Sequence, residues 1–282
     1  MSSKRSAALL LSLCFLLMVG CATLLPQNRY AVANRIAAAA GFQKSAISTS
    51  SFTLTAYMRV KNPGGPIHVY IEGDGTAWLS RTRLSGDPTP RTPLVLELAV
   101  LDPASNVAYL ARPGQYAADG VPDCDAAYWS GKRFSNDVVE AINKTVDTLR
   151  DRAGSREIHL IGYSGGAAVA ALIAALIAAR RSDAASLRTV AGNLDPEAVN
   201  RYHHVSPMKD FLNPMDAAEK IRDLPQRHFV GSQDTVVPPG IARSFLKRAG
   251  RRDSSGITVV EGATHTRGWQ EHWKELLVIP LN

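Results

Sequence analysis

One serine stands among three glycines in the segment IGYSGGAA, residues 161–168. A serine hydroxyl can act as a nucleophile when a neighbouring base takes its proton. The residues from Ile158 to Ile161 are mostly apolar, as in a buried parallel strand, and those from Ala167 to Ala179 are good helix formers. The sequence therefore predicts a strand, a tight turn that carries Ser164, and a helix.

The pentapeptide from Gly162 to Gly166 has the form G-x-S-x-G, the pattern of a nucleophile elbow. Such a sharp turn strains its central residue, and glycines remove the Cβ atoms where strand and helix approach each other. The hydroxyl of Ser164 would project at the helix N-terminus, where unpaired backbone N–H groups favour developing negative charge. The alternative interpretation is a glycine-rich connection that holds an inert serine.

A serine nucleophile also needs a base and a group that orients the base, and two downstream loops offer them. Asp234 follows a predicted strand at 227–230, and His265 follows another at 257–260. Open α/β sheets build their sites at the carboxyl ends of their strands, so both side chains are expected at one edge. The order Ser, Asp, His is that of the α/β-hydrolases. We therefore interpret Ser164 as nucleophile, His265 as general base and Asp234 as the acid that orients it.

A second carboxylate leaves the choice of acid open. Asp195 follows a predicted strand at 187–191, and Pro196 directly after it suggests a turn or a helix cap. Asp234 lies in GSQDTVVP, where the residues Val236 to Pro238 would fix the loop against the sheet. The GSQDTVVP segment favours Asp234 as the acid, and Asp195 remains the alternative.

Six segments together resemble a known superfamily: YIEGDGTAWLSR, DPTPRTP, YLARPGQY, RFSNDVV, GYSGGAA and GSQDTVVP. From about Ile67 to the C-terminus the chain resembles the α/β-hydrolases, and among them a group of bacterial lipoproteins. The resemblance implies an α/β-hydrolase fold, with a mostly parallel central sheet and helices on both faces. It also implies acyl transfer by a serine hydrolase, with no cofactor.

The same resemblance directs attention to the loop after a predicted strand at Ile67–Ile71. In α/β-hydrolases this loop supplies one backbone N–H of the oxyanion hole, and the residue after the nucleophile supplies the other. The resemblance thus assigns these donors to Asp74 and Gly165. The chain has Glu72-Gly73 where the family more often has His-Gly. The alternative is a β-hairpin, because Asp-Gly is a strong turn signal.

Strand and helix signals alternate along the chain, which predicts an α/β fold with a mostly parallel sheet covered on both faces. Helices are predicted at 94–101, at 136–152 with Gly154 as the stop, and at 241–248. Of the 282 residues, 45% are hydrophobic and 20% charged, which is ordinary for a globular protein. We expect residues 21–282 to form one domain, with a cap or substrate-facing insertion near 195–225.

Five residues of this insertion have side chains that could line an acyl pocket, or could pack helices onto the sheet instead. They are Tyr202, His203, His204, Met208 and Phe211.

The first twenty residues have the form of an export signal. Lys4 and Arg5 precede an apolar run at 7–19 that is short for a membrane span. The segment LMVGC resembles the bacterial lipobox, which predicts a signal peptide at 1–20 and lipidation of Cys21. Because residue 22 is not Asp, the outer membrane is favoured in a Gram-negative cell. The alternatives are a plain signal peptide, with a periplasmic or secreted product, and an uncleaved anchor.

Composition argues against several other classes of protein. The formal net charge of +7 comes without a basic run that carries interleaved aromatic residues, so nucleic-acid binding is not expected. No HExxH or CxxC spacing occurs, and the adjacent His203 and His204 would point apart, so no metal site is predicted. Cys124 has no partner left and is interpreted as a buried or free thiol.

Together these patterns predict an envelope serine hydrolase that acts on a small-molecule or lipid ester. The alternatives are a serine peptidase or thioesterase, and a lipid-anchored binding protein that keeps the fold without turnover.

Overall fold

The computed structural model describes most of the chain. The predicted signal peptide and Cys21 lie outside the described residues, which are 28–117, 120, 122–180, 183–209, 211–251 and 254–282.

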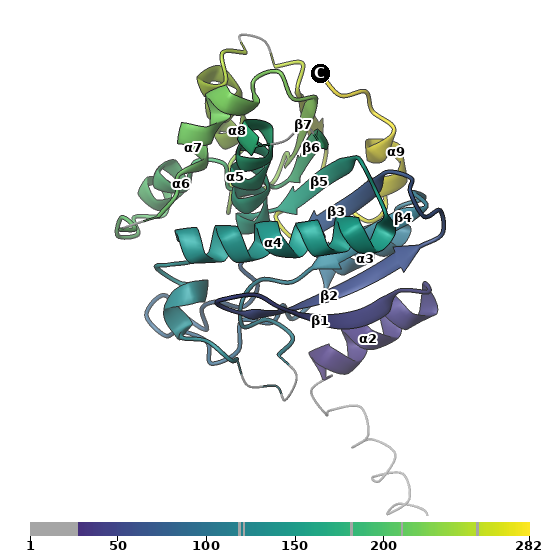
Figure 1. Ribbon diagram of the computed structural model, residues 1–282. Helices are drawn as coiled ribbons and strands as arrows, with labels where there is room; N and C mark the ends of the chain where they lie inside the picture. Colours follow the sequence, from purple (N-terminus) through teal and green to yellow (C-terminus); the bar gives the residue numbers. More distant parts are fainter. Residues whose placement is uncertain (1–27, 118–119, 121, 181–182, 210, 252–253) are drawn as a thin grey trace, which may run out of the picture.

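Eight strands of the described chain form one sheet, in the order β1-β2-β4-β3-β5-β6-β7-β8 (Figure 1). Strand β2 pairs antiparallel with β1 and with β4, and the pairs from β4 to β8 are parallel. The strands are β1 (Gln43–Ser48), β2 (Thr53–Val60), β3 (Ile67–Ile71), β4 (Asn106–Leu110), β5 (Ile158–Tyr163), β6 (Ala184–Val190), β7 (Gln226–Gly231) and β8 (Ile257–Val260).

Helices cover both faces of this sheet, and each face has its own hydrophobic cluster. Helices α4, α5 and α8 pack on one face, and α2, α3 and α9 on the other (Figure 1). The mostly parallel sheet between two helical layers confirms the predicted fold class. The α-helices are α2 (Arg29–Ala39), α3 (Leu94–Leu101), α4 (Asn136–Ala153), α5 (Gly165–Arg180), α6 (Pro196–Tyr202), α7 (Pro214–Ala217), α8 (Gly240–Arg248) and α9 (Trp273–Leu277), and the short 3₁₀ helices are η2 (Ala126–Trp129) and η3 (Ala218–Ile221).

Strand β3 shows why the parallel strands are apolar on both sides. Ile67, Val69 and Ile71 belong to the cluster under α4 and α5, whereas Tyr70 belongs to the opposite cluster. Successive side chains of a strand point to opposite faces, so a strand covered on both faces has no solvent side. This burial on both faces explains why β3 appears in the sequence as an apolar run.

Several predicted elements agree with the structure, and others were missed. The predicted bounds of β3, α3 and β8 are confirmed. Helix α4 ends at Ala153, and Gly154 caps it with the left-handed φ of 62° that favours glycine there. The β-hairpin alternative after Ile71 is wrong, because β3 pairs with β4 and β5 and not with the chain that follows it. The sequence analysis did not predict α2, β1, β2, β4 or α9.

The segment after β6 contains short helices rather than a separate domain. Helix α6 is followed by α7 and η3, which contact α5. Met208 and Phe211 are partly buried and pack against the core cluster, whereas Tyr202 is exposed. Two of the five side chains suggested for a pocket therefore pack the segment onto the domain.

Within the described residues, none of the helices has the length and apolar character needed to cross a bilayer.

Candidate active site

Ser164 occupies the turn between β5 and α5 in a strained backbone conformation. Its φ of 50° lies in the left-handed region that residues with a Cβ seldom adopt. Three backbone hydrogen bonds hold it there: its N–H donates to Val190 O at 3.0 Å, and its carbonyl accepts from Ala167 N and Asn193 N, each at 3.0 Å. Strain of this kind persists only where the surroundings over-determine it, and it is common at functional sites.

The glycines of the motif let the strand and the helix meet. A Cβ on Gly166 would overlap the carbonyl oxygens of Ile71 and Glu72, and a Cβ on Gly162 would lie 2.5 Å from Ala167 Cα. These obstacles are backbone atoms, which cannot turn aside as a flexible side chain can. The elbow therefore requires glycine at positions 162 and 166.

Ser164, His265 and Asp234 form a continuous chain of hydrogen bonds. The distance between Ser164 Oγ and His265 Nε2 is 3.0 Å, and that between His265 Nδ1 and Asp234 Oδ2 is 2.9 Å. These residues follow β5, β8 and β7 respectively, at the carboxyl edge of the sheet. If Nδ1 carries the proton and donates it to Asp234, Nε2 is free to accept a proton from the serine hydroxyl.

The Asp234 carboxylate is fully buried and held by the backbone that follows it. Its Oδ1 accepts hydrogen bonds from Val236 N and Val237 N, both at 2.8 Å, which leaves Oδ2 for the imidazole of His265. The GSQDTVVP motif thus folds into a turn that orients this carboxylate.

Asp195 makes a different contact. Its Oδ1 accepts from Ala198 N at 2.9 Å and caps the N-terminus of α6. The structure therefore brings His265 together with Asp234, the favoured acid, while Asp195 stabilises a helix end.

The backbone of His265 has two side-chain donors that the sequence reading missed. The carbonyl oxygen of His265 accepts from Tyr163 OH at 3.0 Å and from Trp269 Nε1 at 3.1 Å. Burial raises the pKa of Tyr163, so its hydroxyl remains a neutral donor. Tyr163 occupies the first of the two variable positions of the G-x-S-x-G motif, which the pattern does not specify.

The loop after β3 lies directly against the nucleophile. A Cβ on Gly73 would be 3.2 Å from Ser164 Cβ, so the Gly73-Asp74 backbone passes beside the serine. Two contacts brace this loop: Gln115 Nε2 donates to Gly73 O at 3.0 Å, and Thr76 N–H donates to Pro88 O at 2.9 Å. The predicted oxyanion donors, the N–H groups of Asp74 and Gly165, therefore belong to segments on either side of Ser164.

The side chain of Asp74 introduces a charge that the sequence reading did not consider. A Cβ on Gly165 would overlap the Asp74 carboxylate, so this group lies over the start of α5. Asp74 Oδ2 is 3.2 Å from Arg133 Nε, and Oδ1 is 3.5 Å from an Arg112 guanidinium nitrogen. Two arginines thus offset a negative charge beside the place where an oxyanion would form.

Arg112 and Arg133 are held as a pair. Arg112 is buried and donates to the carbonyl oxygen of Arg133, and both guanidinium groups lie near the ring of Phe134. Burial lowers the pKa of Arg112 to about 10, which still leaves the guanidinium charged at neutral pH.

Glu72 is the buried carboxylate behind the same loop. Its Oε1 accepts from Gly73 N at 3.0 Å, and its Oε2 accepts from Tyr109 OH at 2.9 Å. Burial raises the pKa of Glu72 to about 7, because water no longer solvates the charge, although both hydrogen bonds favour the ionised form. Glu72 therefore titrates near neutral pH.

A metal site and a reactive thiol would each need particular groups among the described residues. No group of three His, Cys, Asp or Glu residues there could hold a metal ion. His203 Nε2 lies 2.8 Å from Val236 O instead. Cys124 is a free thiol whose pKa is raised to about 11, chiefly by burial, which disfavours the reactive thiolate.

Glu72 should make the stability of the protein depend on pH. Its pKa is higher in the folded than in the unfolded chain, so the folded state binds more protons between about pH 4.5 and 7. The free energy of unfolding of the wild type, relative to Glu72→Gln, should therefore fall as the pH rises through this window. The fall should be at most about 3 kcal/mol and level off above pH 7. Urea unfolding of both proteins at several pH values measures it, and a difference that rises with pH would contradict the assignment.

The comparisons with known proteins agree with this geometry. Residues 94–261, more than half of the chain, match the family model described as serine hydrolase (FSH1). A search of curated proteins gave no match.

Solved structures with a similar fold include three with low sequence identity. A membrane phospholipase A described as a bacterial virulence factor has a TM-score of 0.58 and 17% identity, over 96% of this chain and 98% of the other. The protein Est1E from Butyrivibrio proteoclasticus has a TM-score of 0.53 and 15% identity, over 83% of this chain and 93% of the other. An esterase from Pyrococcus furiosus has a TM-score of 0.56 and 17% identity, over 84% of this chain and 88% of the other.

At these identities the solved structures support the fold, and the family match adds the hydrolase chemistry. The chain therefore belongs to the FSH1 serine hydrolase family and is a hydrolase of the α/β-hydrolase superfamily.

Proposed function

We propose that this hydrolase cleaves carboxylic esters by acyl transfer through Ser164, His265 and Asp234. The observation that carries the proposal is the hydrogen-bond chain of 3.0 Å and 2.9 Å through His265, which ends on a buried carboxylate. An inert serine in a glycine-rich turn would need neither the histidine nor the acid.

In the first half of the proposed reaction, Ser164 Oγ attacks the ester carbonyl carbon while His265 Nε2 takes the hydroxyl proton. The imidazolium that results is stabilised by Asp234, whose other oxygen is held by two backbone N–H groups. The carbonyl oxygen becomes an oxyanion, for which Gly165 N–H and Asp74 N–H are the proposed donors. His265 then gives its proton to the leaving alkoxide, and an acyl-enzyme remains on Ser164.

In the second half, water takes the place of the alcohol. His265 accepts a proton from this water, whose oxygen attacks the acyl carbon, and the same oxyanion donors stabilise the second tetrahedral intermediate. Its collapse releases the carboxylic acid and returns the proton to Ser164.

An ester of a small molecule or a lipid is the proposed substrate class. The structural neighbours include a protein named as an esterase and one named as a membrane phospholipase A, which supports an ester, and they also include an acylaminoacyl peptidase. A peptidase, a thioesterase and a binding protein without turnover are the alternatives. A panel of ester, amide and thioester substrates separates the enzymes, and the probe experiment below separates them from the binding protein.

Ser164→Ala should abolish the reaction with a fluorophosphonate probe and lower ester turnover by several orders of magnitude. A residual rate on the order of 10³ to 10⁴ over water should remain, from binding and the oxyanion hole. Circular dichroism should show the fold unchanged. If purified wild type does not react with the probe, or Ser164→Ala retains full labelling, the proposed nucleophile is wrong.

A matched pair of variants tests the acid. Asp234→Asn leaves the shape of the side chain but favours the wrong imidazole tautomer, so kcat should fall about 10⁴-fold with a near-unchanged KM. Asp195→Asn changes only the cap of α6 and should affect stability more than kcat. Steady-state kinetics and thermal unfolding of both variants decide the matter. An inactive, folded Asp195→Asn beside an active Asp234→Asn would transfer the role to Asp195.

We further propose that the protein is a lipoprotein of the bacterial cell envelope, anchored through Cys21, with the outer membrane as its site in a Gram-negative cell. The support is the lipobox-like LMVGC segment alone. Expressed with its own leader, the protein should partition with membranes, and Cys21→Ser should release it or block processing. Intact-mass measurement shows whether a lipid is attached, and an unmodified mature N-terminus away from Cys21 would contradict this proposal.

A further inference from the structure

Exposed apolar side chains are concentrated in loops at the carboxyl edge of the sheet, the edge that carries the candidate active site. Of nine large hydrophobic residues exposed in the described chain, six follow the carboxyl ends of β3, β6 and β7. One group flanks the oxyanion loop and the other lies beside the Asp234 turn, where His203 joins Val236. The six are Trp78, Leu79, Leu84, Tyr202, Val205 and Val236.

The rim loop, residues 78–84, combines this apolar surface with positive charge. Its sequence is WLSRTRL, and every one of its residues is exposed. Trp78 pairs with Leu84 across the loop, and Leu79 N–H donates to Arg83 O at 2.8 Å, so the loop has a defined shape. Neither guanidinium, of Arg81 or of Arg83, has an ion-pair or hydrogen-bond partner within the described part of the chain.

The base of the rim loop is fixed to the oxyanion loop. Ser85 N–H donates to Ala77 O at 2.9 Å, and Trp129 Nε1 donates to Ser85 O at 3.1 Å. Pro88 O accepts from Thr76 N, two residues after Asp74. The rim loop therefore projects from the edge of the active site on a rigid support.

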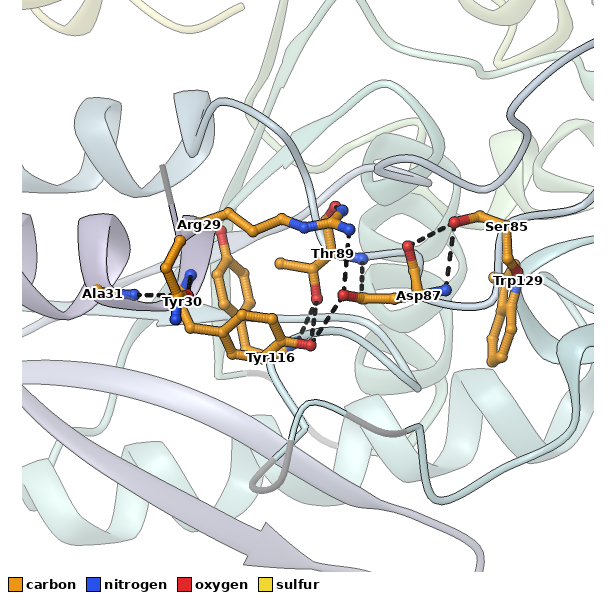
Figure 2. Close-up of polar contacts among 9 residues, drawn as sticks. Arg29, Tyr30, Ala31, Ser85, Asp87, Thr89, Tyr116 and Trp129 are labelled. Carbon is orange, nitrogen blue, oxygen red and sulfur yellow. Dashed lines mark hydrogen bonds and ion pairs between the residues drawn. The ribbon is translucent and has the colours of Figure 1, made fainter. Parts of the chain in front are cut away.

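The start of α2 is attached to the same support, as Figure 2 shows. Arg29 forms an ion pair with Asp87 at 3.2 Å, and Tyr30 OH donates to the same carboxylate at 3.0 Å. Asp87 in turn accepts from Thr89 N–H at 2.8 Å. The described chain thus begins beside the base of the rim loop.

This attachment limits the distance to a lipid on Cys21. Only six residues lie between Cys21 and Asn28, so these two positions are at most about 25 Å apart when the chain is fully extended. A lipid on Cys21 would therefore hold a bilayer surface near the side of the molecule that carries the rim loop.

We infer that the rim loop docks on an anionic phospholipid bilayer, with Trp78, Leu79 and Leu84 in the interface and Arg81 and Arg83 on the headgroups. Tryptophan favours the level of the headgroups because its ring is apolar and its N–H is polar. Unpaired arginines beside apolar residues match acidic headgroups above acyl chains, and each contributes to binding through the negative surface potential.

Docking would place the candidate active site next to the bilayer and would indicate a lipid ester as the substrate. The choice of substrate rests on the proposed function. Binding itself needs no turnover. It can therefore be measured whether or not the serine reacts.

Tryptophan fluorescence reports on the rim loop directly. Trp78 has 48% of its surface exposed, whereas the other three tryptophans are buried. The full-length protein is reconstituted with vesicles of phosphatidylcholine, with or without phosphatidylglycerol. On the anionic vesicles the Trp78 emission should shift to the blue, brominated lipids should quench it, and high salt should reduce both effects. Trp78→Phe should remove the signal.

Matched variants separate docking from the anchor. The double substitution Arg81→Gln with Arg83→Gln should weaken docking on anionic vesicles on the order of 20-fold. Each arginine near such a surface contributes a comparable factor to the binding affinity. Leu79→Ser should weaken it on both kinds of vesicle. The controls are Lys247→Gln with Lys274→Gln for the charges and Val278→Ser for the apolar change, all at exposed positions on α8, α9 and the end of α9. They should leave the emission of Trp78 unchanged.

Three outcomes would overturn the inference. Trp78 emission that is the same with and without vesicles shows that the rim loop stays in water. Equal effects of the arginine variants and the lysine controls show that the positive charge of the rim loop does not contribute to binding the bilayer. A blue shift that depends on protein concentration without vesicles identifies a second copy of the chain as the partner. A protein that docks but does not react with a fluorophosphonate retains this inference and loses the proposed function.

Discussion

The architecture of the site depends on the close approach of β5, α5 and β3 around Ser164. The turn holds a non-glycine residue at positive φ, and backbone atoms fill the space beside Gly162 and Gly166. Because no side chain intervenes, the loop after β3 reaches the serine and the start of α5 together. A strained nucleophile and a tightly braced oxyanion loop are therefore two consequences of the same packing.

Two carboxylates and two arginines balance the charge around the candidate site. The Asp74 carboxylate lies over Gly165, and Glu72 lies behind the same loop. Arg112 and Arg133 offset the charge of Asp74. Burial raises the pKa of Glu72 to about 7. Preorganised charges act strongly in such low-dielectric surroundings, so these four residues set the field in which an oxyanion would develop.

The sequence predicted what depends on local pattern, and missed what depends on contacts between distant segments. Apolar runs bounded by glycines identified β3, β5 and β8. The loops after β5, β7 and β8 contain Ser164, Asp234 and His265, the three residues that the structure joins by hydrogen bonds. Strand β1 was missed because it is polar and exposed along most of its length. The Asp74 ion pairs join three loops far apart in the chain, and no spacing rule relates them. Tyr163 lies at one of the two positions of the elbow motif that the pattern leaves unspecified.

The structure of the phosphonylated protein tests the account most directly. A phosphonate on a serine nucleophile mimics the tetrahedral intermediate, and its phosphoryl oxygen stands for the oxyanion. The account predicts a covalent bond to Ser164 Oγ, with that oxygen within hydrogen-bond distance of the Gly165 and Asp74 N–H groups and His265 still bonded to Asp234. An adduct on another residue, or a phosphoryl oxygen turned away from both N–H groups, would contradict it.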